Sequence, residues 1–133
     1  MLHEEICTYE VCKLAKEKGF PQHIGNDAYV VENEYDDKYE IGCHYPIQFI
    51  PDYLPTITAP TQSLLQRWLR EEKNIHIEVI ATASGYYWCI NKTNGTSITD
   101  SDVLDRGVND GGCWDTYELA LEDALKYTLE NLV

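Results

Sequence analysis

The sequence feature that constrains the fold most is the unbroken apolar periodicity of residues 117–132. Apolar or small side chains recur there at positions i, i+3, i+4 and i+7, which is the spacing of one helix face. Asp115 and Glu118 have the spacing of a capping box at the start of this helix. A helix with a continuous apolar face must bury it against another element. The face consists of Tyr117, Ala120, Leu121, Ala124, Leu125, Thr128, Leu129 and Leu132.

A second amphipathic helix is predicted just after the middle of the chain. Thr58 or Thr61 can cap it, and it is expected to end near Lys73. Its polar side chains fall on the side opposite the apolar ones when residues are placed at helical spacing. The apolar face, which we expect to be core, consists of Leu64, Leu65, Trp68 and Leu69.

A hairpin is predicted between the two helices. Apolar side chains alternate in strand 75–79, Ser84-Gly85 is a plausible tight turn, and 86–91 is the partner strand. Residues 96–114 form a long polar loop with a short strand expected near Val103. Two helices on one face of a small antiparallel sheet would bury both apolar faces. We therefore expect the α+β class, with the C-terminal half in the order helix, hairpin, loop, helix.

The N-terminal half has weaker signals. Thr8 and Gly19 bound a short helix by their capping preferences. Two short strands at 29–32 and 39–43 are expected to form a hairpin around an acidic turn. Residues 46–60 contain four prolines and are predicted to be a connector outside the core. We expect one domain over 1–133, composed of the N-terminal helix and hairpin (1–45), the connector (46–60) and the helix-hairpin-helix core (61–133).

The charge of the chain excludes several classes of partner. The sequence has 23 acidic and 10 basic residues, a formal net charge of −13. Such a field repels phosphate backbones and anionic membranes and favours basic partners. No apolar run approaches the length of a membrane span. The acidic start "MLHEEICTYE" has no apolar region typical of a signal peptide, so a cytoplasmic location is expected.

No motif in the sequence indicates a metal, a cofactor or a catalytic site. The five cysteines are odd in number and form no CxxC pattern, which favours reduced thiols over disulfides or zinc. The histidines have no HxH or HExxH spacing, and the loop "TDSDVLDRGVNDGG" lacks the ligands of a calcium loop. Cys43 and His44 are adjacent and point to opposite sides of an extended chain, so they cannot act together. No cofactor is expected.

The element order of the C-terminal half is that of a double-stranded-RNA-binding domain. That module needs basic residues at the start of its last helix to hold phosphates. The corresponding turn here reads "TYELALEDAL" and is acidic. The topology can be shared without the function.

Polar and aromatic residues that the predicted core does not use are the candidates for binding. On the second helix, the basic strip is most simply a solvated face that pairs with neighbouring acids. On the hairpin, the sheet face turned away from the helices is either covered by the N-terminal half, paired in a homodimer, or docked on another protein. We favour the first explanation, that the N-terminal half covers this sheet face. That half has apolar side chains that could pack there, namely Ile47, Phe49, Ile50 and Leu54. The candidates are Gln66, Arg67, Arg70, His76, Glu78 and Tyr87.

The segments "APTQSLLQRWLREEKNIHIEV", "YYW" and "TYELALEDAL" together resemble a family of small acidic proteins from gut Bacteroidetes and their phages and prophages. The resemblance covers roughly the C-terminal 75 residues, and the N-terminal segment "TYEVCKLAKEKGF" more loosely. It implies a setting, a phage or another mobile element, and it implies no activity, cofactor or site residue.

Three functional hypotheses remain at this point. The first is a non-enzymatic accessory protein that acts by protein–protein interaction through the exposed side of the hairpin and the outer helix face. The second is an acidic mimic of nucleic acid that occupies a DNA-binding protein. The third is an enzyme whose site is assembled from distant residues. The affinity of a mimic for its partner should fall steeply as the salt concentration rises, whereas the affinity of an apolar interface should change little.

Overall fold

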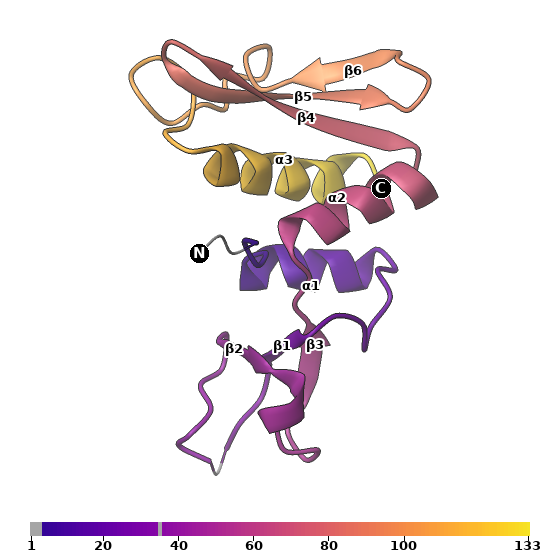
Figure 1. The fold of residues 1–133 in the computed structure, drawn as a ribbon, viewed down its shortest axis with the longest axis vertical. Coiled ribbons are helices and arrows are strands. Elements are labelled where there is room, and N and C mark those ends of the chain that lie inside the picture. Colours follow the sequence, from indigo (N-terminus) through magenta and orange to yellow (C-terminus); the bar gives the residue numbers. More distant parts are fainter. Residues whose placement is uncertain (1–3, 35) are drawn as a thin grey trace.

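The computed structural model describes residues 4–34 and 36–133 and has the α+β architecture predicted from the sequence. Figure 1 shows its layers: a sheet, two helices beneath it, a third helix below them, and a second small sheet at the far end. In chain order the elements are α1 (Tyr9–Glu17), β1 (Asp27–Val30), β2 (His44–Pro46), the 3₁₀ turn η1 (Ile47–Phe49), β3 (Thr56–Thr58), α2 (Gln62–Glu72), β4 (Ile75–Thr82), β5 (Gly85–Lys92), β6 (Ser97–Asp100) and α3 (Tyr117–Asn131).

The C-terminal half has the predicted order of elements and the predicted packing. Helices α2 and α3 lie against one face of the antiparallel sheet β4-β5-β6 (Figure 1). Each helix begins at a threonine whose hydroxyl accepts a backbone hydrogen bond, Thr61 from Leu64 and Thr116 from Leu119. The capping residue of α3 is therefore Thr116 and not the predicted Asp115.

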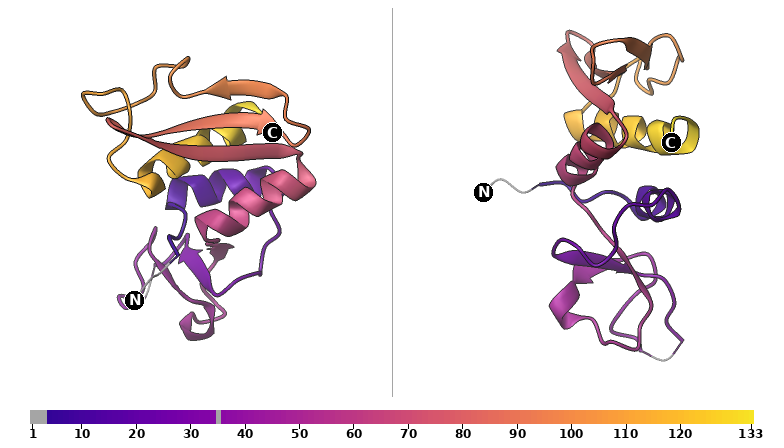
Figure 2. Two further views of the ribbon diagram at one scale, coloured as in Figure 1. Left: turned by 45° about the horizontal axis from the view of Figure 1, so that its top comes forward. Right: turned by 90° about the vertical axis from the view of Figure 1, so that its right-hand side faces the viewer.

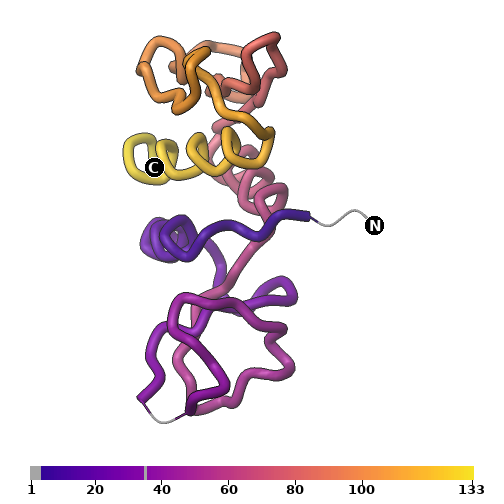
Figure 3. Tube along the Cα trace, turned by 90° about the vertical axis from the view of Figure 1, so that its left-hand side faces the viewer, coloured from indigo at the N-terminus to yellow at the C-terminus, as the bar shows by residue number. Residues whose placement is uncertain are grey.

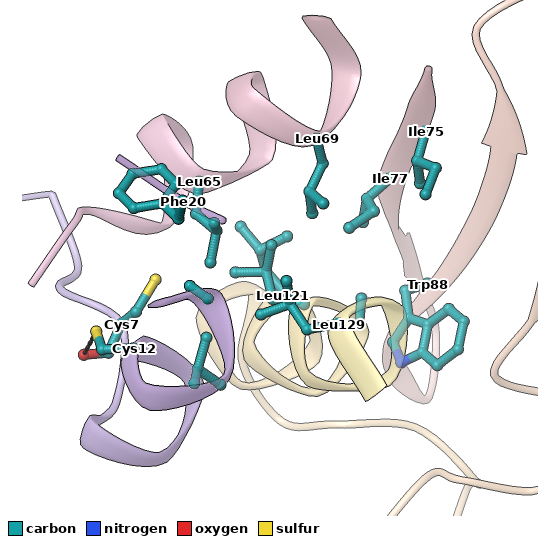
Figure 4. Packing of buried hydrophobic residues seen from close by; sticks show 14 of the residues in the cluster. Cys7, Cys12, Phe20, Leu65, Leu69, Ile75, Ile77, Trp88, Leu121 and Leu129 are labelled. Atoms are coloured by element: carbon teal, nitrogen blue, oxygen red, sulfur yellow. Dashed lines mark hydrogen bonds between the residues drawn. The ribbon is translucent and has the colours of Figure 1, made fainter. Parts of the chain in front are cut away.

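The core lies between these helices, the sheet and α1. Figure 4 shows the side chains of Leu65, Leu121, Leu129 and Trp88 converging from α2, α3 and β5. Trp68 is only half-buried, at the edge of this core, where its ring meets the Phe20 ring edge-on at 5.3 Å. The apolar helix faces are thus core, as the sequence predicts, and α1 contributes to the same cluster.

The hairpin turn and the third strand differ in position from the prediction. Thr82 pairs with Gly85, so the two-residue turn is 83–84. The third strand is β6 at Ser97–Asp100, whereas Val103 is 75% exposed in the following loop. Ser101 is the last residue of this stretch bonded to β5, through Trp88, and the chain then runs through a turn that carries Val103 away from the sheet.

The N-terminal half departs most from the prediction. β1 pairs with both β2 and β3, and the described residues between β1 and β2 (31–34 and 36–43) contain no strand. The hairpin predicted at 29–32 and 39–43 is therefore displaced. The 46–60 segment is also more than a connector, because its β-branched Thr56–Thr58 stretch completes this sheet and buries Ile57. A proline removes only its own backbone N–H from a sheet, and no proline lies within Thr56–Thr58.

A polar network joins the N-terminal helix to the two others. The Glu122 carboxylate on α3 accepts hydrogen bonds from the Thr8 backbone N–H (2.9 Å) and the Thr8 hydroxyl (2.8 Å). Its other oxygen accepts from the buried Gln62 side chain on α2 at 2.9 Å. Thr8 in turn caps α1. One carboxylate thus fixes the relative positions of three helices.

The N-terminal half lies on the side of the helices that is opposite the sheet β4-β5-β6 (Figures 1 and 3). It therefore does not cover the outer face of that sheet, which corrects the leading sequence-based explanation. The apolar residues expected to do so have other roles: Leu54 is buried within its own half, and Phe49 is 62% exposed. Both views in Figure 2 leave the outer face of the sheet free of helices.

Candidate functional site

The outer face of the sheet β4-β5-β6 is the candidate functional site, and we call it the open face. Strand register assigns its residues, because paired residues on antiparallel strands share a face. Trp88 and Ile90 point to the helices and are fully buried, so their neighbours along β5 point outward. The open face consists of His76, Glu78, Ile80, Thr82, Tyr87, Cys89, Asn91 and Asp100.

A cavity of about 330 Å³ lies at one end of the open face. Half-buried Tyr87 lines it together with Asp100 and Asp102, and one Asp100 carboxylate oxygen accepts a hydrogen bond from the Val103 backbone N–H. The backbone of Gly111 and Gly112 closes the other side. The cavity therefore combines an aromatic surface with two negative charges.

The loop that forms one wall of this cavity is held firmly in place. The Arg106 guanidinium makes two hydrogen bonds of 2.8 Å to the Asp123 carboxylate on α3, and this pairing raises the pKa of Arg106. Trp114 exchanges two backbone hydrogen bonds of 2.8 Å with Tyr86. A Cβ atom at Gly85 would collide with the Trp114 carbonyl, so this close approach requires glycine. The cavity wall is thus built into the fold.

Three polar side chains form a chain of contacts across the open face. His76 Nε2 lies 3.2 Å from Glu78 Oε1, and the Cys89 thiol donates to Glu78 Oε2 at 3.7 Å. Burial, the Glu78 charge and the Asp100 charge all raise the pKa of Cys89. The thiol is therefore held in its protonated form, which is the opposite of what a nucleophile requires. Among residues 4–34 and 36–133, no cluster of His, Cys, Asp and Glu could hold a metal ion.

The structure divides the six residues predicted for binding into two groups. His76, Glu78 and Tyr87 lie together on the open face. Gln66 lies on α2 and donates a 2.8 Å hydrogen bond to the Ile77 carbonyl, which is a structural contact. Arg67 pairs with Glu71 one turn along the same helix at 3.0 Å.

Arg67 and Arg70 also line a larger cavity of about 560 Å³ between α2 and the start of β1. Its wall contains Glu4 and Asp27 as well, so the formal charges of its lining cancel. Both carboxylates are already engaged, Glu4 with Ser63 and Asp27 with His44. This cavity therefore has no excess charge to select a ligand.

Sequence reasoning missed Asp100, Asp102 and Cys113 as parts of the site. Cys113 is buried beside Thr82 at 3.9 Å, which brings the loop onto the open face. The usable signal was Gly111 in an aspartate-containing loop, because a glycine allows the loop backbone to approach Ser84 in the hairpin turn closely. Only the fold of the loop brings these residues next to Tyr87.

No family model, no curated protein and no solved structure matches this chain. In the part of the chain that the structure describes, no helix is both long and apolar enough to cross a membrane.

Proposed function

We propose that this protein is a non-enzymatic interaction module that binds a basic partner protein through its open face. The observation that carries the proposal is the cavity lined by Tyr87, Asp100 and Asp102 on a sheet face that no helix of the described chain covers. An aromatic ring attracts a cation placed over it, and a carboxylate accepts charge-assisted hydrogen bonds from the same group. A lysine or arginine side chain of the partner satisfies both.

The surroundings of the cavity support the same class of partner. Ile80 is half-buried and lies opposite Tyr87 on the neighbouring strand. It gives a partner an apolar side chain to contact near the aspartates of the cavity. Glu78 supplies a further negative charge on the same face. The net charge of −13 steers a basic partner toward the molecule and opposes self-association through this face. For this reason we favour a foreign partner over a homodimer.

We extend the proposal to the biological setting that the resemblance implies. The protein would act in the cytoplasm as an accessory factor of a phage or another mobile element. A nucleic-acid mimic is the alternative, and it differs in a testable way. A mimic binds through charge spread over its surface, so no single aromatic side chain should control its affinity.

The test is a selection of binders from a displayed library of random peptides at physiological ionic strength. We expect the selected peptides to be rich in Lys and Arg, and the Tyr87→Ser and Asp102→Asn substitutions to weaken their binding by about tenfold or more. Tyr53→Ser is the matched control, since Tyr53 is an exposed tyrosine in the N-terminal half. Selected peptides without basic residues, or equal losses in the Tyr87 and Tyr53 variants, would contradict the proposal.

A further inference from the structure

Strand β4 is an edge of its sheet, and the register identifies which of its backbone groups point outward. On β5, Tyr86 and Trp88 direct their N–H and C=O groups to the β6 side, where they bond to Trp114 and Ser101. The alternate residues of β5 therefore bond to β4. Their partners are His76, Glu78, Ile80 and Thr82. The remaining residues of β4 direct their backbone groups away from the sheet.

Only the first part of this edge is protected. The Gln66 side chain on α2 donates to the Ile77 carbonyl at 2.8 Å and so caps one outward group. Val79 and Ala81 come next along the edge. Within the described part of the chain, no hydrogen-bond partner is found for the outward N–H and C=O groups of either residue. Val79 is half-buried and Ala81 is exposed, so neither residue is fully covered by the described chain.

The edge also lacks several of the features that normally prevent strand addition, although it carries one charged residue, Glu78. Edge strands are usually short, bulged, or interrupted by proline or lysine. β6, at the other edge, is four residues long and its pairing with β5 is irregular. β4 has eight residues, pairs regularly with β5 over its whole length, and contains neither proline nor lysine.

We propose that β4 accepts an extended, basic segment of a partner protein as an added strand, bonded to the backbone of Val79 and Ala81. This inference rests on the proposed function and specifies how the partner of the open face is held. Added strands obtain affinity from main-chain hydrogen bonds and specificity from alternate side chains. On the open-face side, those side chains would lie beside Glu78 and Ile80.

The charge of the chain decides between a foreign strand and a second copy. Pairing two copies edge to edge would bring together two molecules that each carry a net charge of −13. A basic segment instead lowers the electrostatic free energy as it approaches Glu78 and the aspartates of the cavity. The segment that fits the edge therefore alternates basic and apolar side chains.

The probe is a peptide of about ten residues, the length of a long strand, in which Lys and Val alternate. Its control has the same sequence with an N-methyl group on every Val, because the Val residues face Val79 and Ala81 when the Lys side chains lie beside Glu78. This control keeps the charges and blocks strand pairing in that orientation. We expect the first peptide to bind at physiological ionic strength and the methylated one to bind at least about tenfold more weakly. Equal binding of the two peptides, or no binding of either at about 1 mM, would overturn the inference.

A substitution at the edge provides the second arm of the experiment. Ala81→Pro removes an outward N–H and no donor of the β4–β5 ladder, because Ala81 does not bond to β5, and proline is tolerated on edge strands. We expect it to weaken binding by about tenfold, and Ala81→Ser, which retains the N–H, to leave binding unchanged. If Tyr87→Ser weakens binding and Ala81→Pro does not, the strand inference fails while the proposed function stands.

Amide hydrogen exchange on the unmodified protein gives a readout that does not depend on any variant. The Val79 and Ala81 amides should exchange faster than the Ile80 amide in the free protein, since Ile80 bonds to β5. The Lys–Val peptide should slow the exchange at Val79 and Ala81. Exchange that is already slow at both positions in the free protein would show that the edge is occupied and would overturn the inference.

Discussion

At the scale of single residues, the open face is defined by side chains whose chemistry is set by their neighbours. Cys89 is the clearest case, because burial and two acidic side chains raise the pKa of its thiol. Glu78 contacts both Cys89 and His76. A nucleophile would need a positive environment, and this thiol has a negative one. The surroundings of Cys89 therefore disfavour a role for its thiol as a nucleophile.

The state of Cys89 can be tested by alkylation with iodoacetamide, followed by mass spectrometry of the Cys89 peptide. A raised pKa means that less thiolate is present near pH 8, so Cys89 should react more slowly than a free cysteine and accelerate as the pH rises. Glu78→Gln removes a nearby negative charge, lowers the pKa of Cys89, and should speed the reaction by more than about twofold. Glu71→Gln, on the outer surface of α2, is the control. Identical rates in both variants would rule out the Glu78 contact.

At the scale of elements, the helices could be predicted from the sequence and the short strands could not. A periodicity that continues over several turns, as from Tyr117 to Leu132, has a single structural explanation. β1 and β3 contain only four and three residues, too few for a period to emerge, and β3 lies between prolines. The cavity could not be predicted either. Asp102 lies in an irregular loop, and only the conformation of that loop places it in the same cavity as Tyr87.

The packing of α3 gives a stability prediction at this scale. Leu125 is fully buried, so Leu125→Ala should lower the free energy of unfolding by about 2–5 kcal/mol through lost burial and the cavity left behind. Leu119 lies on the same helix and is 55% exposed, so Leu119→Ala should change the free energy of unfolding by less than about 0.5 kcal/mol. Denaturant unfolding measures both values. Similar losses in the two variants would mean that α3 buries a different face.

At the scale of the whole molecule, the helices separate two ends with different surfaces. The sheet β4-β5-β6 lies at one end and the small sheet β1–β3 at the other, with Glu122 holding the helices between them in register (Figure 1). The three open-face residues predicted from the sequence lie at the first end, whereas Arg67 and Arg70 line the cavity near β1. Partner binding is therefore expected at one end only.

The most direct test of the central claim is chemical-shift mapping of isotope-labelled protein as the alternating Lys–Val peptide is added. We expect shifts confined to the open face and its edge, at Glu78, Ala81, Tyr87 and Asp102, and none with duplex DNA at physiological salt. Peptide-induced shifts that centre instead on Arg67 and the cavity near β1, or equal shifts with DNA, would contradict it.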